Sequence, residues 1–190
     1  PIFGVEAYFL PSIDEWRDDY NRIKEDAKLA KSLAKEGNTA GATVEDEEAS
    51  KKAIKSVINR RRHLILLAQN QTGLNNLFKI VSESYREENF YRYPRVDYDM
   101  LNRHSEGVIA ASACLGGPYA GNYWANRDDG PEAVREAMRE TSRRFVEVFG
   151  DRWYGELQWN NIPEQHELNQ YIIEVCKEFD ITLISTADSH

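Results

Sequence analysis

Cysteine is scarce in this 190-residue sequence, and its two cysteines follow no disulfide or zinc-finger spacing. Cys114 and Cys176 lie far apart and form no CxxC pair, which excludes a disulfide scaffold and predicts a reduced, cytoplasmic setting. No segment approaches the roughly 18 uninterrupted apolar residues of a membrane-spanning helix. No basic stretch followed by an apolar stretch marks a secretory signal. We therefore expect no membrane partner.

Positive charge is also in deficit, with 24 Lys and Arg against 32 Asp and Glu and a net charge of −8. An acidic chain cannot bind along a phosphate backbone through its overall charge. Any contact with nucleic acid must be local, or must depend on bound metal ions that reverse the sign of a site. Because the first residue is Pro1 and not Met, we expect the chain to be a segment of a longer product.

The order of periodic segments predicts an α/β fold. Short runs of apolar and β-branched residues predict strands, and apolar residues at helical spacing predict helices between them. Strands that alternate with helices are typical of a parallel sheet, and four or five such units predict part of a barrel. The predicted strands are residues 2–10, 63–68, 107–113, 153–158 and 181–186.

Residues 12–62 interrupt this alternation and are predicted to form a helical hairpin. Ser12 and Glu15 have the spacing of a capping box at the start of the first helix. Gly37 is predicted to end that helix, and Thr43 to open the second. We expect this hairpin to be attached to the main body of the domain.

Two predictions concern the packing of helices in the main body. Thr72 is expected to cap a helix that turns one apolar face, which includes Phe78 and Val81, toward the core. Cys176 falls on the apolar face of the last predicted helix and is expected to lie in the core.

Side chains that can bind metal ions occur near the ends of the predicted strands. They are Glu6, His63, Cys114, Asp188 and His190. In α/β barrels, ligands converge at the carboxyl ends of the strands. A set of carboxylate, imidazole and thiolate groups suits zinc or mixed first-row metals, which can activate water and hold phosphate oxygens. The pattern therefore suggests metal-dependent hydrolysis of phosphoesters.

Each of these residues also has a purely structural interpretation. Glu6 alternates with Val5 and Ala7 and could be solvated on the polar face of its strand. His63 begins its strand and could be a hydrogen-bonded structural residue. Cys114 could be a small buried apolar side chain. The spacing alone leaves both interpretations open.

Residues 85–95 interleave aromatic residues with arginines, including Arg92 and Arg95. This mixture can stack on bases and hold phosphates, so the segment is a candidate DNA contact. The alternative is a loop fixed by its aromatic side chains, in which the arginines pair with Glu87 and Glu88.

Six segments occur in an order that is typical of one family. They are GVEAY (4–8), HLILLAQNQTGLNNL (63–77), FYRYPR (90–95), EGVIAASACLGG (106–117), ELQ (156–158) and TADSH (186–190). Together they resemble the PHP (polymerase and histidinol phosphatase) domain of bacterial, or phage-encoded, DNA polymerase III α subunits. The resemblance covers nearly the whole chain except residues 12–62.

The resemblance implies a distorted (β/α)7 barrel with up to three metal ions, which are zinc, manganese or iron. It further implies phosphoester hydrolysis, including 3′–5′ exonuclease activity. Glu6, His63, Cys114, Asp188 and His190 match five of the family's ligand positions. The family's first ligand group, His-x-His, is not found here. We therefore expect a PHP segment over residues 1–190 that is incomplete on its N-terminal side and carries residues 12–62 as an insertion.

The resemblance also implies partners, which are the remainder of the polymerase α subunit, DNA and a proofreading exonuclease. Two alternatives of different class remain open. One is an inactive PHP scaffold that stiffens the polymerase and docks the exonuclease. The other is a stand-alone PHP phosphatase that acts on small phosphate esters.

Overall fold

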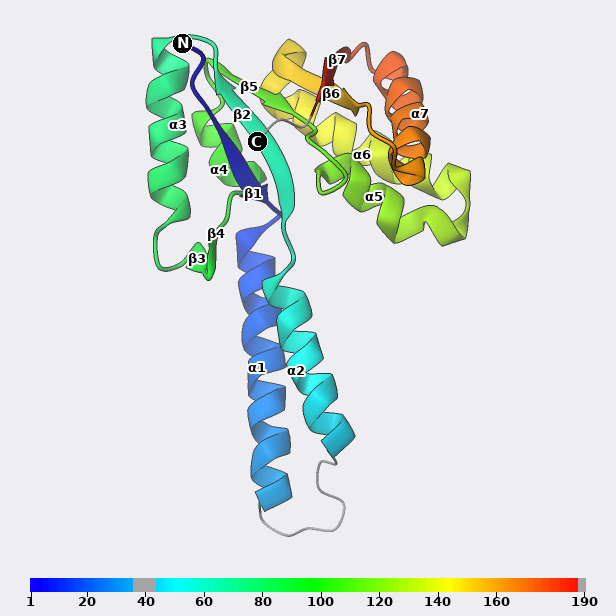
Figure 1. The fold of residues 1–190 in the computed structure, drawn as a ribbon. Coiled ribbons are helices and arrows are strands. Elements are labelled where there is room, and N and C mark those ends of the chain that lie inside the picture. Colours follow the sequence, from blue (N-terminus) through cyan, green and yellow to red (C-terminus); the bar gives the residue numbers. More distant parts are fainter. Residues whose placement is uncertain (36–43, 188–190) are drawn as a thin grey trace. The chain divides into compact units, whose positions relative to one another are not determined.

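The computed structural model of the chain describes residues 1–35 and 44–187. The chain divides into two compact units, one formed by Pro1–Pro11 together with Arg62–His190 and the other by Ser12–Arg61. The first unit contains the sheet and is called the sheet unit below. The second contains two helices and is called the helical unit (Figure 1).

The sheet unit is built on five strands in the spatial order β1-β2-β5-β6-β7. Only the pairs β5–β6 and β6–β7 are parallel, whereas β1–β2 and β2–β5 are antiparallel. The prediction of a parallel sheet is therefore wrong for half of it, and in the described residues the sheet is open and not closed into a barrel. The strands are β1 (Gly4–Phe9), β2 (Arg62–Ala68), β5 (Val108–Ala111), β6 (Trp153–Gln158) and β7 (Thr182–Thr186).

The connections explain why the first three strands are antiparallel. Phe9 at the end of β1 pairs with Arg62 at the start of β2, so the chain returns beside the strand it has just left. The segment between β2 and β5 also leaves and returns at one end of the sheet, since the Gln69 N–H donates to the Gly107 carbonyl at 2.9 Å. A parallel pair would require a crossover to the opposite end.

Between the strands of the sheet, the chain forms five α-helices and a small two-stranded ribbon. They are α3 (Gln71–Ser84), the ribbon β3 (Phe90–Tyr91) with β4 (Tyr93–Pro94), α4 (Tyr98–His104), α5 (Pro118–Asn126), α6 (Pro131–Phe149) and α7 (Pro163–Glu178). The sequence pattern did not predict α5. Its signal is Gly117 at the N-cap followed by Pro118 in the first turn.

The helices α6 and α7 cover one face of the sheet, and the main core lies there. Phe145 of α6 packs against Phe9 of β1 and stacks on Trp153 of β6, with ring centroids 5.1 and 4.1 Å apart. Leu64 and Leu66 of β2 have no exposed surface, whereas the alternate residues of this strand are only partly buried. Because side chains alternate across a strand, the sheet has one buried face and one more open face.

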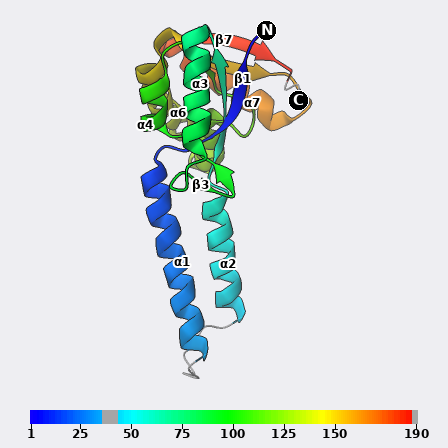
Figure 2. The ribbon, with the colours of Figure 1, turned by 90° about the vertical axis from the view of Figure 1, so that its left-hand side faces the viewer.

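Helix α3 packs against β2 and β5 through a close backbone contact (Figure 2). A Cβ atom on Gly73 would lie 1.8 Å from the carbonyl oxygen of Gly107, so only glycine fits at this position. Asn70, and not Thr72 as predicted, caps the helix, because its side chain accepts from the Gly73 N–H at 2.9 Å. The approach at Gly73 sets which face is buried, and it leaves Phe78 exposed (62%) and Val81 partly exposed (36%), contrary to the prediction.

The helical unit is an antiparallel pair formed by α1 (Ile13–Lys35) and α2 (Val44–Ile58). The predicted cap of α1 is confirmed, since the Glu15 N–H donates to the Ser12 hydroxyl at 3.3 Å. The indole of Trp16 donates to the Val57 carbonyl at 2.9 Å and joins the two helices. Gly37 and Thr43, the predicted ends of the helices, lie outside the described residues.

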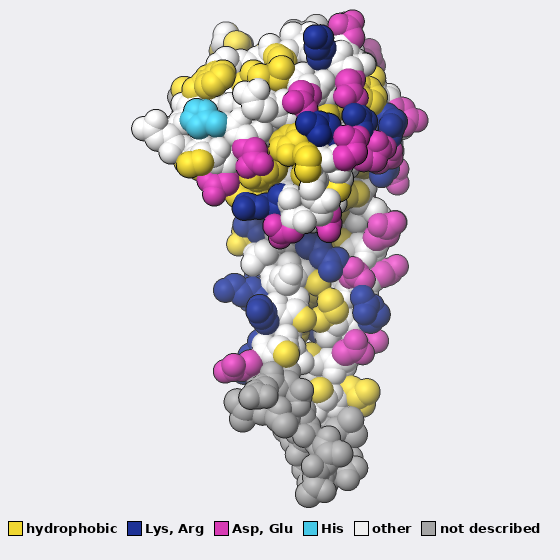
Figure 3. Space-filling view, turned by 90° about the vertical axis from the view of Figure 1, so that its right-hand side faces the viewer, with side chains coloured by type: hydrophobic (Ala, Val, Ile, Leu, Met, Phe, Trp, Pro, Cys, Tyr) yellow, Lys and Arg dark blue, Asp and Glu magenta, His cyan; other side chains and the backbone are white. Residues whose placement is uncertain are grey.

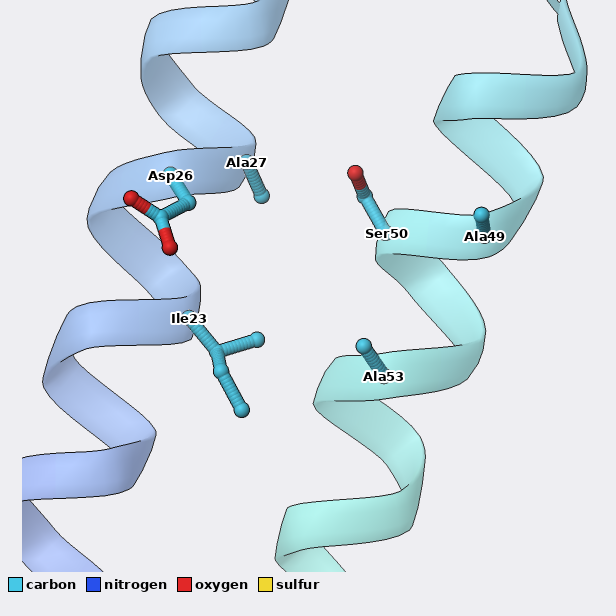
Figure 4. Close-up of a pocket in the computed structure, with 6 residues that line it drawn as sticks. All are labelled: Ile23, Asp26, Ala27, Ala49, Ser50 and Ala53. Carbon is cyan, nitrogen blue, oxygen red and sulfur yellow. The ribbon is translucent and has the colours of Figure 1, made fainter.

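Farther along the helical unit the two helices are separated by a cavity of about 280 Å³. Figure 4 shows Ile23 and Ala27 of α1 and Ser50 and Ala53 of α2 directed into this space. Because most of these side chains are small, the helices bury little apolar surface against each other here. None of the helices that the structure describes is long and apolar enough to cross a membrane.

Replacing Gly73 by Ala is expected to destabilise the chain by about 2 kcal/mol, because the new methyl group overlaps the Gly107 carbonyl and one backbone must move. The measurement is urea unfolding followed by circular dichroism. Ser82→Ala, at an exposed position of the same helix, is the control and should change the free energy of unfolding by less than about 0.5 kcal/mol. Equal stability of the two variants would show that α3 does not rest on this contact.

A second prediction is that the helical unit can be removed without loss of the sheet. Phe9 and Arg62 are neighbours across the β1–β2 ladder, so a linker of a few Gly and Ser residues in place of residues 14–61 can close the turn. Soluble expression and an unchanged sheet signal in circular dichroism are expected. The matched control, the same replacement of α3, should abolish soluble folding. Insolubility of the first deletion would make the helical unit part of the fold's core.

Candidate metal centre

The candidate centre lies on the more open face of the sheet, where the antiparallel register places two of the predicted ligands. Tyr8 pairs with His63, and Glu6 pairs with Ile65, so these side chains share one face. This face is opposite to the one on which Leu64 and Leu66 are buried under the helices. Cys114 follows β5, the neighbour of β2 on its other side.

Two donor atoms of different chemistry lie beside one ring nitrogen of His63. The Nδ1 atom lies 3.3 Å from Oε1 of Glu6 and 3.6 Å from Sγ of Cys114. The side chains of Glu6 and His63 are each 34% exposed, so a ligand can reach the group from solvent. The structure therefore brings together three of the five predicted ligands. Glu6 and Cys114 each lie more than 50 residues from His63 in the sequence.

A tight turn after β5 holds Cys114 beside His63. Ala113 adopts a left-handed conformation (φ 57°), which reverses the chain direction just before the cysteine. The Gly117 N–H donates to the Cys114 carbonyl at 2.8 Å, and the His63 N–H donates to the Gly116 carbonyl at 2.9 Å. A Cβ atom on Gly117 would lie 1.9 Å from the Ser112 carbonyl oxygen. The motif Cys114–Gly117 is thus needed to bring the thiol to the histidine.

The donor chemistry of this group fits a divalent metal ion. Carboxylate, imidazole and thiol groups are the ligands that zinc and other first-row metals accept. Within residues 1–35 and 44–187, however, no three His, Cys, Asp or Glu side chains are arranged so that they could hold one ion between them. The other two predicted ligands, Asp188 and His190, lie outside the described residues.

The two arginines predicted to contact DNA differ in their placement. Arg92 is exposed at the turn of the β3–β4 ribbon, with φ at 59°. Arg95 has no exposed surface, and its guanidinium donates to the carbonyls of Tyr91 and Tyr93 at 3.0 and 2.9 Å. An arginine without exposed surface cannot reach a phosphate, so Arg95 shapes the ribbon and is not a candidate DNA contact.

Sequence reasoning missed one carboxylate on this face of the sheet. Glu156 was part of the quoted segment 156–158 but was not predicted to belong to a site. It pairs with Ile184 in the parallel register and is only 5% exposed. The signal that could have found it is the alternation of β6, because an acidic residue between two core positions of a buried strand is costly unless it has partners.

Charges on the sheet unit are mixed and largely paired. Figure 3 shows basic and acidic side chains interleaved on the face it presents, without a continuous basic area. On α6 and α7, Arg135 and Arg139 donate to Glu174 and Glu178 at 2.8 and 2.7 Å. The hydrogen bond from Arg139 lowers the pKa of Glu178 below its usual value. These arginines are engaged by carboxylates and are not offered to a phosphate backbone.

Comparison with known proteins decides the family. The PHP domain model matches residues 1–160, which is most of the chain. The chain belongs to the PHP domain family. Related proteins include the DNA polymerase III α subunits of Aquifex aeolicus (44% identical over 128 residues) and Borreliella burgdorferi (35% over 179 residues). That of Deinococcus radiodurans is 30% identical over 190 residues.

These matches cover 67%, 84% and 100% of this PHP chain, respectively. They cover only 10%, 15% and 11% of the relatives, so the chain spans a small part of the length of these polymerase subunits. The resemblance found from the six sequence segments is confirmed at the level of the family.

The two cysteines of this PHP domain are expected to differ in reactivity. Burial raises the pKa of the Cys176 thiol to about 12, so this residue should resist alkylation until the protein unfolds. Cys114 is partly exposed and, if it binds metal, should be protected by zinc and released by a chelator. Iodoacetamide labelling of the complete polypeptide, followed by peptide mass spectrometry, measures both rates.

Cys176→Ala serves as the control in this labelling experiment, because it should leave the zinc-dependent labelling unchanged. Labelling of Cys114 at one rate with and without zinc would make it a packing residue and not a ligand.

Proposed function

We propose that this chain is the PHP segment of a replicative polymerase of the DNA polymerase III α type, and that its site hydrolyses phosphoesters with bound metal ions. The observation that carries the proposal is the convergence of Glu6 and Cys114 on Nδ1 of His63 in a chain of this family. The proposed activity on DNA is removal of nucleotides in the 3′–5′ direction.

In the proposed centre, Glu6, His63 and Cys114 hold a metal ion together with Asp188 and His190. When bound there, a zinc, manganese or iron ion would supply an activated water and neutralise phosphate charge. The chain's own contribution is to orient the donors. Pairing with Tyr8 fixes the start of β2, and the ring of Tyr8 lies 5.7 Å from that of His63 and limits its rotation. Up to three ions are proposed, as the resemblance to the family implies.

The proposed partners are DNA and the remainder of the polymerase polypeptide. The relatives are many times longer than the matched segment, so other parts of such a chain are available to cover exposed apolar surface. We propose that the remainder of the polypeptide contacts the exposed face of α3 and the residue that follows this helix. Phe78 and Tyr85 are 62% and 60% exposed there. Arg92 remains the candidate DNA contact. A proofreading exonuclease is a further proposed partner, and the proposed location is the cytoplasm.

Residues 12–62 are proposed to be an insertion in the PHP segment that takes no part in the metal chemistry. The division of the chain into a sheet unit and a helical unit supports this proposal. Two basic residues at the end of this segment have a carboxylate partner or a buried position. Arg60 donates to Asp19 at 2.5 Å, and burial lowers the pKa of Arg62.

A second candidate function is that of an inactive PHP scaffold that stabilises the polymerase. It is favoured by the direct contacts of the His63 Nδ1 atom with Glu6 and Cys114, at 3.3 and 3.6 Å, which a purely structural hydrogen-bonded group would also make. A stand-alone phosphatase is less well supported, because the relatives described above are all polymerase subunits.

The experiment that separates these functions is a 3′-end hydrolysis assay with the complete polypeptide in the presence of Mn²⁺ or Zn²⁺. We expect release of nucleotides from a labelled DNA primer, and we expect His63→Ala to reduce it at least about 100-fold while primer extension by the polymerase is unchanged. The isolated 190-residue chain should bind these ions weakly and hydrolyse little, since each missing partner costs about tenfold or more in affinity.

Arg143→Ala, on the exposed surface of α6, is the matched control and should leave hydrolysis unchanged. If the complete polypeptide extends primers but shows no hydrolysis that depends on His63, the scaffold function is correct and the enzymatic proposal is wrong.

A further inference from the structure

Glu156 is an acidic residue at a buried position of the sheet unit. It lies in the middle of β6 and is 5% exposed, and its neighbours in the strand, Gly155 and Leu157, are also buried. Burying a carboxylate is costly unless hydrogen bonds satisfy its oxygens. The partners of Glu156 therefore indicate what the residue is for.

One of these partners belongs to β6 itself, one ends the neighbouring strand β7, and one directly follows β5, the neighbour on the other side. The carboxylate oxygen Oε1 accepts from the Thr186 hydroxyl at 2.6 Å and from the Gln158 side-chain amide at 3.2 Å. The backbone N–H of Glu156 donates to the Ser112 hydroxyl at 2.8 Å. Glu156 thus joins the segment that follows β5, through its backbone, to the end of β7, through its carboxylate.

Both joined segments lead directly to predicted ligands. Ser112 precedes Cys114 by two residues, and Thr186 precedes Asp188 by two residues. The Thr186 hydroxyl donates to the Glu156 carboxylate within the normal distance for a bond between two oxygen atoms. A hydrophobic side chain at position 156 would fill the same space but would leave the Thr186 hydroxyl without this acceptor.

We propose that Glu156 is a positioning residue for the metal centre, which holds the end of β7 in register with the end of β5 so that the ligands that follow them act together. The proposal rests on the proposed function, because it requires that Cys114 binds metal. Glu156 acts through Thr186, and its role is to accept a hydrogen bond and not to bind the ion. Residues that fix ligands in this way contribute strongly to metal affinity.

The test is titration of the complete polypeptide with Co²⁺, in which the cobalt–thiolate absorption band reports the bond to Cys114. Cys114→Ser must remove the band and thereby assigns it. We expect Glu156→Leu to weaken Co²⁺ binding about tenfold or more, and Thr186→Val to weaken it similarly. Glu156→Gln should stay within about twofold of the wild type, because the amide oxygen still accepts from Thr186. The double variant Glu156→Leu/Thr186→Val should be no weaker than Glu156→Leu alone, since both remove one interaction.

Ser142→Ala is the control for a general loss of stability. Ser142 has no exposed surface and its hydroxyl lies 2.7 Å from that of Tyr119, so the variant removes a buried hydrogen bond away from the donors. It should lower the urea midpoint and leave Co²⁺ affinity unchanged. Thr186→Val keeps the size of the side chain, so it tests the hydrogen bond even if Glu156→Leu does not fold.

Two results would overturn the inference in distinguishable ways. If the wild type gives no cobalt–thiolate band, the proposed metal function is wrong and the positioning role is lost with it. If the wild type gives the band and Thr186→Val or Glu156→Leu binds Co²⁺ as tightly as the wild type, the metal function stands and the role of Glu156 is purely structural. Weak binding by Glu156→Gln, equal to that of Glu156→Leu, would also contradict a role through the hydrogen bond.

Discussion

The antiparallel pairing of β1 with β2 is the interaction on which the candidate centre depends. It places Glu6 beside His63 although the whole helical unit lies between them in the sequence. A shift of this register by one residue would turn Glu6 to the helix-covered face and separate the two donors. Ala7 and Phe9, the buried side chains of β1, oppose such a shift because it would move them out of the core. Hydrophobic burial on one face therefore secures the chemistry on the other.

The sheet supplies the candidate centre from two halves with different topology. The antiparallel half contributes Glu6 and His63, and the turn after β5 brings Cys114 to them. The parallel half, β5 to β7, leads toward Asp188 and His190 and is tied together at its end by Glu156. The two halves meet at β5, which pairs with β2 on one side and with β6 on the other. A centre assembled in this way requires that β5 keeps its register with both of these strands.

Much of the fold could be predicted from the sequence, because local patterns determine it. The strands are continuous apolar runs between turn residues, and the capping residue Ser12 has a clear spacing to Glu15, so these elements were found within a few residues. Strand direction could not be predicted, because it depends on where a connection re-enters the sheet. The exposure of Phe78 follows from the contact between Gly73 and Gly107, which no periodicity reveals.

The candidate site was predictable only in part, for the same reason. Residue type made Glu6, His63 and Cys114 candidates, the family resemblance matched them to ligand positions, and the structure brings them together. The burial of Arg95 and the bridging bonds of Glu156 arise from tertiary contacts, so composition was a poor guide to both. Arg95 was predicted to contact DNA because it lies in a segment that interleaves aromatic residues with arginines.

The most direct test of the metal centre is anomalous X-ray diffraction at the zinc absorption edge, from crystals of the complete polypeptide grown with zinc. The account predicts an anomalous peak within about 2.0–2.3 Å of both the His63 imidazole and the Cys114 sulfur, with the Glu6 carboxylate as a neighbour. A structure in which zinc binds elsewhere, while His63 and Cys114 contact only each other, would contradict it.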